Sequence, residues 1–94
     1  MVIESATRFR KLFRIGEVMR YSGLSRQTVH NYTVLGLITE QERTPGGHRL
    51  YSEDVFARLE RIKELRKTRT LSEIRRILEE EDARARQFEA EQQQ

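Results

Sequence analysis

The stretch Arg43-Thr44-Pro45-Gly46-Gly47-His48-Arg49-Leu50-Tyr51 decides the fold of this chain. Its centre predicts a tight turn, because proline presets φ at about −65° at the second position of a β-turn and glycine accepts a positive φ at the third. Thr44-Pro45-Gly46-Gly47 therefore predicts a type II turn, with a strand on each side forming a hairpin.

This hairpin, residues 43–51, carries polar side chains and is named the first wing. Pairing outward from the expected turn sets Arg43 opposite His48 and Glu42 opposite Arg49. Donor groups then gather at the tip, and one arginine faces a carboxylate across the ladder. Such a surface is suited to contact with an anion.

Two short helices are predicted before the hairpin. Apolar residues follow helical spacing from Ile15, and Gly23 stands where a short helix needs a left-handed residue at its C-terminal end. Ser25 is suited to cap a second helix that runs to about Leu35. Two short helices joined by a tight glycine-containing turn indicate a helix-turn-helix motif.

The second of these helices has a polar face that could read DNA, because its side chains reach phosphates and base edges and an α-helix fits the major groove. An isolated helix of this kind is more often simply solvated, and the basic hairpin beside it is what favours the reading role. The residues on this face are Arg26, Gln27, Thr28, His30, Asn31 and Thr33.

Two further helices are predicted after the hairpin, separated by a basic loop. Ser52 is expected to cap the third helix, with apolar positions Val55, Leu59, Ile62 and Leu65. Ser72 is expected to cap the fourth helix, with apolar positions Leu71, Ile74, Ile77 and Leu78. The loop between them, residues 66–70, is basic and is expected to act as a second wing.

Composition limits what else the chain can be. It has 94 residues, no cysteine and only two histidines, so we expect one domain, no disulfide, no metal and no other cofactor. No run approaches the ~20 apolar residues of a membrane span, and the start does not resemble a secretory signal, so we expect a cytoplasmic protein.

Charge is unevenly distributed along the chain. Residues 1–78 hold 16 basic and 9 acidic side chains, a balance of +7, whereas residues 79–94 hold 2 and 6, a balance of −4. A basic body suggests a polyanion partner, chiefly nucleic acid, although composition alone leaves a merely solvated surface equally open.

We therefore expect a mainly α fold, a winged helix-turn-helix with a small β-hairpin wing, four short helices and an acidic C-terminal helical tail. Residues 1–12 are expected to form a flexible arm whose basic side chains, together with Arg14, could follow a phosphate backbone. Residues 13–78 form the DNA-binding domain, and residues 79–94 form the tail. The tail lacks a sustained apolar seam, and its Phe88 is equally open to self-association and to exposure.

Three segments resemble the MerR family of winged helix-turn-helix transcription regulators: residues 14–18, residues 23–29 leading into 35–38, and residues 43–55. The resemblance covers about residues 13–78. It implies sequence-specific binding to double-stranded promoter DNA as a homodimer, with the second helix in the major groove and the wings on the flanking backbone.

The resemblance also implies which residues contact DNA. The implied contacts are Arg26, Thr28 and His30 on the reading helix, Arg43, His48, Arg49 and Tyr51 on the first wing, and Arg66, Lys67 and Arg69 on the second wing. Gln27 and Asn31 complete the predicted set, because they share the polar face of the reading helix.

The chain departs from the family pattern in two places. Where the family usually has an arginine, two aromatic residues and an acid, this chain has His30-Asn31-Tyr32-Thr33, which predicts an altered base preference. The family usually continues into a long coiled-coil helix and an effector domain, whereas the sequence here stops without a convincing apolar seam. We expect either a short regulator or the DNA-binding part of a longer one, and in the first case a dimer that is weak away from DNA.

Other functions are less well supported. No nucleophile, base and orienting group share a plausible site, so catalysis is not expected. An excisionase-like architectural factor, which bends DNA for recombination, has a similar small winged form. A protein-interaction module that uses the basic body and acidic tail is the alternative outside DNA binding.

Overall fold

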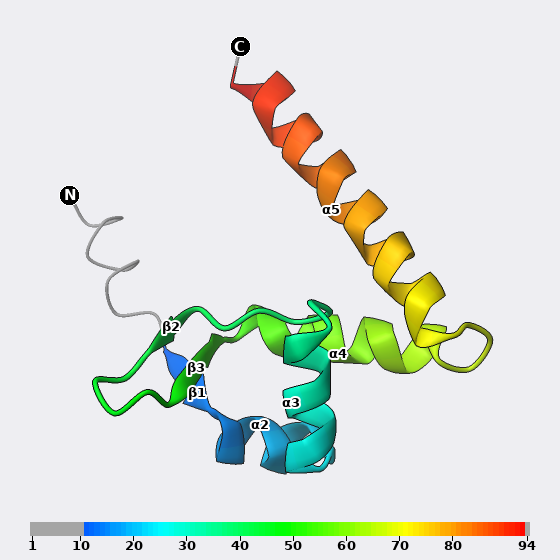
Figure 1. Ribbon diagram of the computed structural model, residues 1–94. Helices are drawn as coiled ribbons and strands as arrows, with labels where there is room; N and C mark the ends of the chain where they lie inside the picture. Colours follow the sequence, from blue (N-terminus) through cyan, green and yellow to red (C-terminus); the bar gives the residue numbers. More distant parts are fainter. Residues whose placement is uncertain (1–10, 94) are drawn as a thin grey trace.

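The computed structural model describes residues 11–93 and is mainly helical (Figure 1). Its elements in order are β1 (Leu12–Arg14), α2 (Ile15–Ser22), α3 (Arg26–Val34), β2 (Glu42–Arg43), β3 (Arg49–Ser52), α4 (Asp54–Leu65) and α5 (Leu71–Gln92). The predicted winged helix-turn-helix fold with four helices is confirmed. The fourth helix is not short, because α5 has 22 residues and joins the predicted fourth helix to the acidic tail. Most of the predicted arm lies outside the described residues.

The wing belongs to a three-stranded antiparallel sheet with the order β1-β3-β2. Strand β1 pairs with β3, with Phe13 opposite Tyr51. The sequence did not predict β1, because three residues are too few to show a clear strand alternation. The wing is thus attached to a segment that leads directly into α2.

The predicted turn type and register of the wing are wrong. Arg43 lies opposite Arg49, and Glu42 lies opposite Leu50. The positive φ of 87° falls on Gly47 and not on the preceding glycine, which is the arrangement of a hairpin turn followed by a left-handed residue that forms a bulge. This extra residue shifts the pairing by one position, because the backbone of Thr44 pairs with His48.

The helix-turn-helix is held by the local signals that the sequence contains. Gly23 ends α2 with φ 75°, and its N–H donates to the Met19 carbonyl at 2.9 Å. The Ser25 hydroxyl accepts from the backbone N–H of Thr28 at 3.1 Å and so caps α3. The predicted end of α2 at Gly23 and the predicted start of α3 at Ser25 are both confirmed.

The other two predicted caps are wrong. Ser52 is the last residue of β3, and α4 begins after Glu53. Helix α5 begins two residues earlier than Ser72 would set it, because Thr70 and Glu73 form a reciprocal capping box with hydrogen bonds of 3.2 and 2.9 Å. Ser72 is therefore an exposed residue in the first turn of α5.

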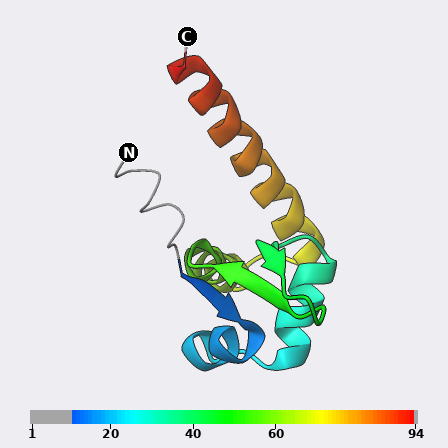
Figure 2. The ribbon, with the colours of Figure 1, turned by 90° about the vertical axis from the view of Figure 1, so that its left-hand side faces the viewer.

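One core joins the reading helix, the wing and the last two helices. Its buried residues are Val18, Val29, Tyr32, Leu37, Ile38, Tyr51, Val55, Leu59, Ile62, Ile74 and Leu78. Beyond Asp82, which Arg58 of α4 still holds, α5 projects away from the domain, as both Figure 1 and Figure 2 show. Within residues 11–93, no helix combines the length and apolar composition of a bilayer-spanning segment.

Candidate nucleic-acid interface

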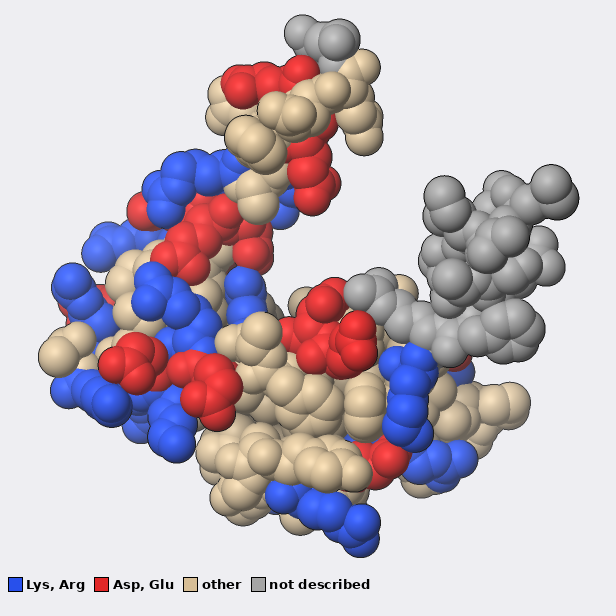
Figure 3. Space-filling view, turned by 180° about the vertical axis from the view of Figure 1, so that it is seen from behind, with Lys and Arg blue, Asp and Glu red and all other residues tan. Residues whose placement is uncertain are grey.

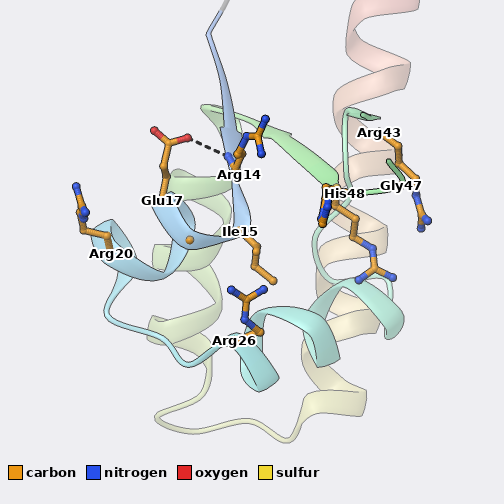
Figure 4. Close-up of a pocket in the computed structure, with 10 residues that line it drawn as sticks. Arg14, Ile15, Glu17, Arg20, Arg26, Arg43, Gly47 and His48 are labelled. Atoms are coloured by element: carbon orange, nitrogen blue, oxygen red, sulfur yellow. Dashed lines mark hydrogen bonds between the residues drawn. The ribbon is translucent and has the colours of Figure 1, made fainter. Parts of the chain in front are cut away.

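A basic groove of about 760 Å³ separates the start of α2 from the first wing, with the first residue of α3 between them (Figure 4). Its lining contains five arginines and one carboxylate, so it is suited to an anion. We name it the arginine groove. The lining residues are Arg14, Ile15, Gly16, Glu17, Arg20, Arg26, Arg43, Gly47, His48 and Arg49.

The only carboxylate in this lining is engaged at the start of α2. Glu17 accepts a hydrogen bond of 3.0 Å from the backbone N–H of Arg14, and Lys11 lies 3.6 Å from its other oxygen. The backbone hydrogen bond is the main reason that the pKa of Glu17 lies below its ordinary value. Within residues 11–93, the guanidinium groups of Arg14, Arg20 and Arg26 make no ion pair.

The reading helix α3 presents polar side chains beside this groove. Gln27 donates to the side-chain oxygen of Asn31 at 2.9 Å, which leaves the Asn31 amide nitrogen free to donate elsewhere. Arg26 and His30 are also exposed. The half-buried Thr28 is occupied at the helix start, where its hydroxyl accepts from Ser25 at 2.9 Å.

A chain of polar contacts joins the reading helix to the first wing. Arg49 on β3 lies 3.0 Å from Nδ1 of His30 and donates to Glu40 at 3.2 Å. Glu40 also accepts from Arg43 on β2. Because a guanidinium only donates, His30 accepts at Nδ1 and carries its proton on Nε2. The helix and wing are therefore linked directly by side chains.

The tip of the first wing is exposed. Both Arg43 and His48 are exposed, and the His48 backbone N–H donates to the Thr44 hydroxyl at 3.1 Å. This bond and the left-handed Gly47 hold the His48 side chain at the edge of the arginine groove. The predicted contact residues of the wing thus share one surface with Arg26 of the reading helix, with the exception of Tyr51.

Tyr51 is a core residue, and its predicted role in DNA contact is wrong. Its side chain is 0% exposed. The Thr33 hydroxyl donates to the Val29 carbonyl at 2.9 Å, so the Tyr51 hydroxyl donates to Thr33 across 2.8 Å. Tyr51 therefore fixes β3 against the reading helix and does not reach a duplex.

The second wing lies at the far end of α4 from the first (Figure 1). Figure 3 shows Lys and Arg side chains gathered at this end of the molecule. Arg66 donates to the Tyr32 hydroxyl at 3.3 Å, while Lys67 and Arg69 lie 3.4 and 3.8 Å from Glu64 and Glu73. These exposed pairs are weak, so the three cations stay available to a phosphate at little cost.

Two of the five arginines of the arginine groove, Arg14 and Arg20, are absent from the predicted contact set. Arg14 is expected only to follow a phosphate backbone together with the basic residues of the arm, and the sequence assigns no role to Arg20. Arg20 lies on α2, the first helix of the helix-turn-helix motif. Arg20 lies across the groove from the wing because of the way β1 and α2 pack against β3. Local sequence patterns do not predict this packing.

Comparison with known proteins places these features in a family. Residues 13–81 match the model of the MerR HTH family regulatory proteins. The chain is 38% identical over 78 residues to the nodulation protein NolA of Bradyrhizobium elkanii, which covers 82% of this chain and 36% of that protein. It is 43% identical over 67 residues to the mercuric resistance operon regulatory protein of Bacillus cereus, covering 70% of this chain and 51% of that protein.

A solved structure gives the same result. The N-terminal part of MtaN, the Bacillus subtilis multidrug transporter activator, matches 70% of this chain and 63% of its own with a TM-score of 0.66 and 31% identity. The chain spans between about a third and a half of the length of the two relatives described above. With a family model that matches most of its residues, this chain belongs to the MerR family of helix-turn-helix regulatory proteins.

Proposed function

We propose that this chain binds double-stranded promoter DNA sequence-specifically, as a homodimer in the cytoplasm, and regulates transcription. The observation that carries the proposal is the side-chain link from His30 through Arg49 to the first wing. A duplex that places base edges against α3 would also bring a phosphate strand to the arginine groove, because the two surfaces are held together.

Side-chain chemistry indicates which residues contact bases and which contact phosphates. Asn31 can pair bidentately with adenine through its side-chain amide, and Arg26 or His30 can meet base edges or phosphates. The cations of the groove and the second wing contact phosphates, which supply affinity but no sequence information by themselves. In this proposal α3 selects the sequence, and both wings fix the protein on the backbone.

The homodimer is proposed through α5. Phe88 is 62% exposed and lies two heptads after the buried Ile74, so it continues the inward side of α5 beyond the domain. A second copy of the helix would cover this ring and place two reading helices on one duplex. The names of the relatives as regulators, including one as an activator, support the proposed role in transcription.

Duplex binding at increasing salt tests the proposal. Fluorescence anisotropy would measure affinity for a random-sequence duplex and for a duplex selected by the protein from random DNA. We expect both affinities to fall steeply with salt and the selected duplex to bind more tightly. Absence of duplex binding at low salt would reject the proposal and favour a protein-interaction module. Selection of clustered recombination-site repeats would favour an architectural factor.

A further inference from the structure

Glu40 is the carboxylate at the base of the first wing, in the segment between α3 and β2. Its side chain is 23% exposed and accepts hydrogen bonds from two guanidinium groups. Arg43 donates from Nε and Nη2, the latter over 3.1 Å, and Arg49 donates from Nε over 3.2 Å. The bond from Arg43 is the main reason that the pKa of Glu40 lies below its ordinary value, so the carboxylate is charged at neutral pH.

This carboxylate orients the two arginines without using up their capacity to bind a phosphate. A guanidinium has five N–H donors. Arg43 keeps Nη1 free, while Arg49 uses Nε for Glu40 and Nη1 for His30 and keeps Nη2 free. One carboxylate also balances only one of the two positive charges. The pair therefore remains cationic, with its free edges held in a fixed direction.

We propose that Glu40 is a positioning residue that sets how strongly the protein discriminates its operator from other duplexes. The inference rests on the proposed DNA-binding function. Phosphates are the same in every DNA sequence, so wing arginines that moved freely would bind any duplex with similar affinity. Because Arg49 is held against His30 on α3, the wing arginines meet phosphates best when α3 is also aligned with the bases of its operator. A duplex that approaches in a different orientation brings its phosphates nearer to Glu40, whose negative charge repels them.

The test compares Glu40→Gln with Glu42→Gln. Both variants remove one negative charge from neighbouring positions, but Glu42 is exposed and makes no ion pair within residues 11–93. We expect Glu42→Gln to tighten binding to selected and random duplexes equally. We expect Glu40→Gln to tighten binding to the random duplex and to lower the ratio of the two affinities by about tenfold, the scale of one lost specific contact.

A second variant separates position from charge. Arg49→Lys keeps the cation but cannot hold Glu40 and His30 at once, because a single ammonium lacks the planar fork of a guanidinium. Its affinity ratio should fall like that of Glu40→Gln. In the free protein, the arginine Nε–H signals in a ¹⁵N spectrum should shift in Glu40→Gln and stay unchanged in Glu42→Gln.

The outcomes distinguish this inference from the function on which it depends. If the wild-type protein does not discriminate between the duplexes, the proposed function fails. If it does discriminate and Glu40→Gln behaves like Glu42→Gln, or Arg49→Lys keeps the full ratio, the inference is overturned. Unchanged Nε–H signals in Glu40→Gln would overturn it as well.

Discussion

At the scale of single residues, the exposed part of α3 separates into side chains that are already engaged and side chains that remain available. Thr28 is part of the helix cap, and His30 accepts from Arg49. Asn31 uses only its oxygen, which accepts from Gln27. The available amide donor of Asn31 is therefore the best candidate on this helix for reading a base.

Replacing Asn31 with alanine should change which base is preferred at one position of each half-site. A lost bidentate contact costs about 1–3 kcal/mol for the preferred base and little for the others. Selection from random DNA followed by competition binding measures this. The matched control is Arg20→Ala in the arginine groove, which should weaken all duplexes alike. An unchanged preference in Asn31→Ala would contradict the assignment.

Tyr51→Phe should destabilise the fold without altering DNA affinity per folded molecule. The variant loses the hydrogen bond to Thr33, which is worth about 1 kcal/mol. Urea unfolding would measure the free energy, and Tyr21→Phe serves as control because that ring is 64% exposed. Weaker DNA binding by a fully stable Tyr51→Phe would return Tyr51 to the contact surface.

At the scale of elements, the local signals located the end of α2 and the start of α3, but not the start of α4, where Ser52 belongs to β3. Gly23 and Ser25 end and begin their helices as predicted. For α5 the sequence offers both Thr70 and Ser72, and the reciprocal bond with Glu73 decides for Thr70. The T-x-x-E spacing was readable in the sequence. The arginine groove could not be predicted from the sequence, because it depends on the pairing of β1 with β3.

Thr70→Ala should destabilise the protein by about 1 kcal/mol, the usual cost of losing a helix N-cap. Ser72→Ala is the matched control, because Ser72 is exposed within the helix and alanine has the higher helix propensity. Thermal unfolding followed by circular dichroism would compare the two. A larger loss in Ser72→Ala would show that the cap lies at Ser72.

The attachment of α5 to α4 should weaken in acid. Arg58 donates to both oxygens of Asp82 at 2.8 and 2.9 Å, and this lowers the pKa of the carboxyl. A carboxyl group whose pKa is lowered by folding stabilises the folded state at pH values above its ordinary pKa of about 4. This stabilisation is lost as the pH falls through the pKa of the folded state. Stability measured in urea from pH 6 to pH 3 should therefore decline, and Asp82→Asn should decline less.

At the scale of the whole molecule, the basic and acidic parts of the chain are separated along α5. The domain carries the arginine groove and second wing, whereas the part of α5 from residue 83 to 92 is exposed throughout. The Arg58 side chain joins these parts, because its Nε donates to the Leu37 carbonyl just after α3 at 2.8 Å while its other nitrogens hold Asp82. The direction of α5 is thereby fixed relative to the reading helix.

This arrangement predicts a weak dimer that DNA strengthens. Stable interfaces bury at least about 1,200 Å² in total, and within the exposed end of α5 Phe88 is the only large apolar side chain. Sedimentation at micromolar concentration should therefore find mainly monomer, with two copies bound once a duplex with two half-sites raises the effective concentration. Phe88→Ala should abolish the cooperative binding of the second copy, while the neighbouring Gln87→Ala should not. A tight dimer in the absence of DNA would contradict this prediction, because it requires an apolar contact surface larger than the one that α5 exposes.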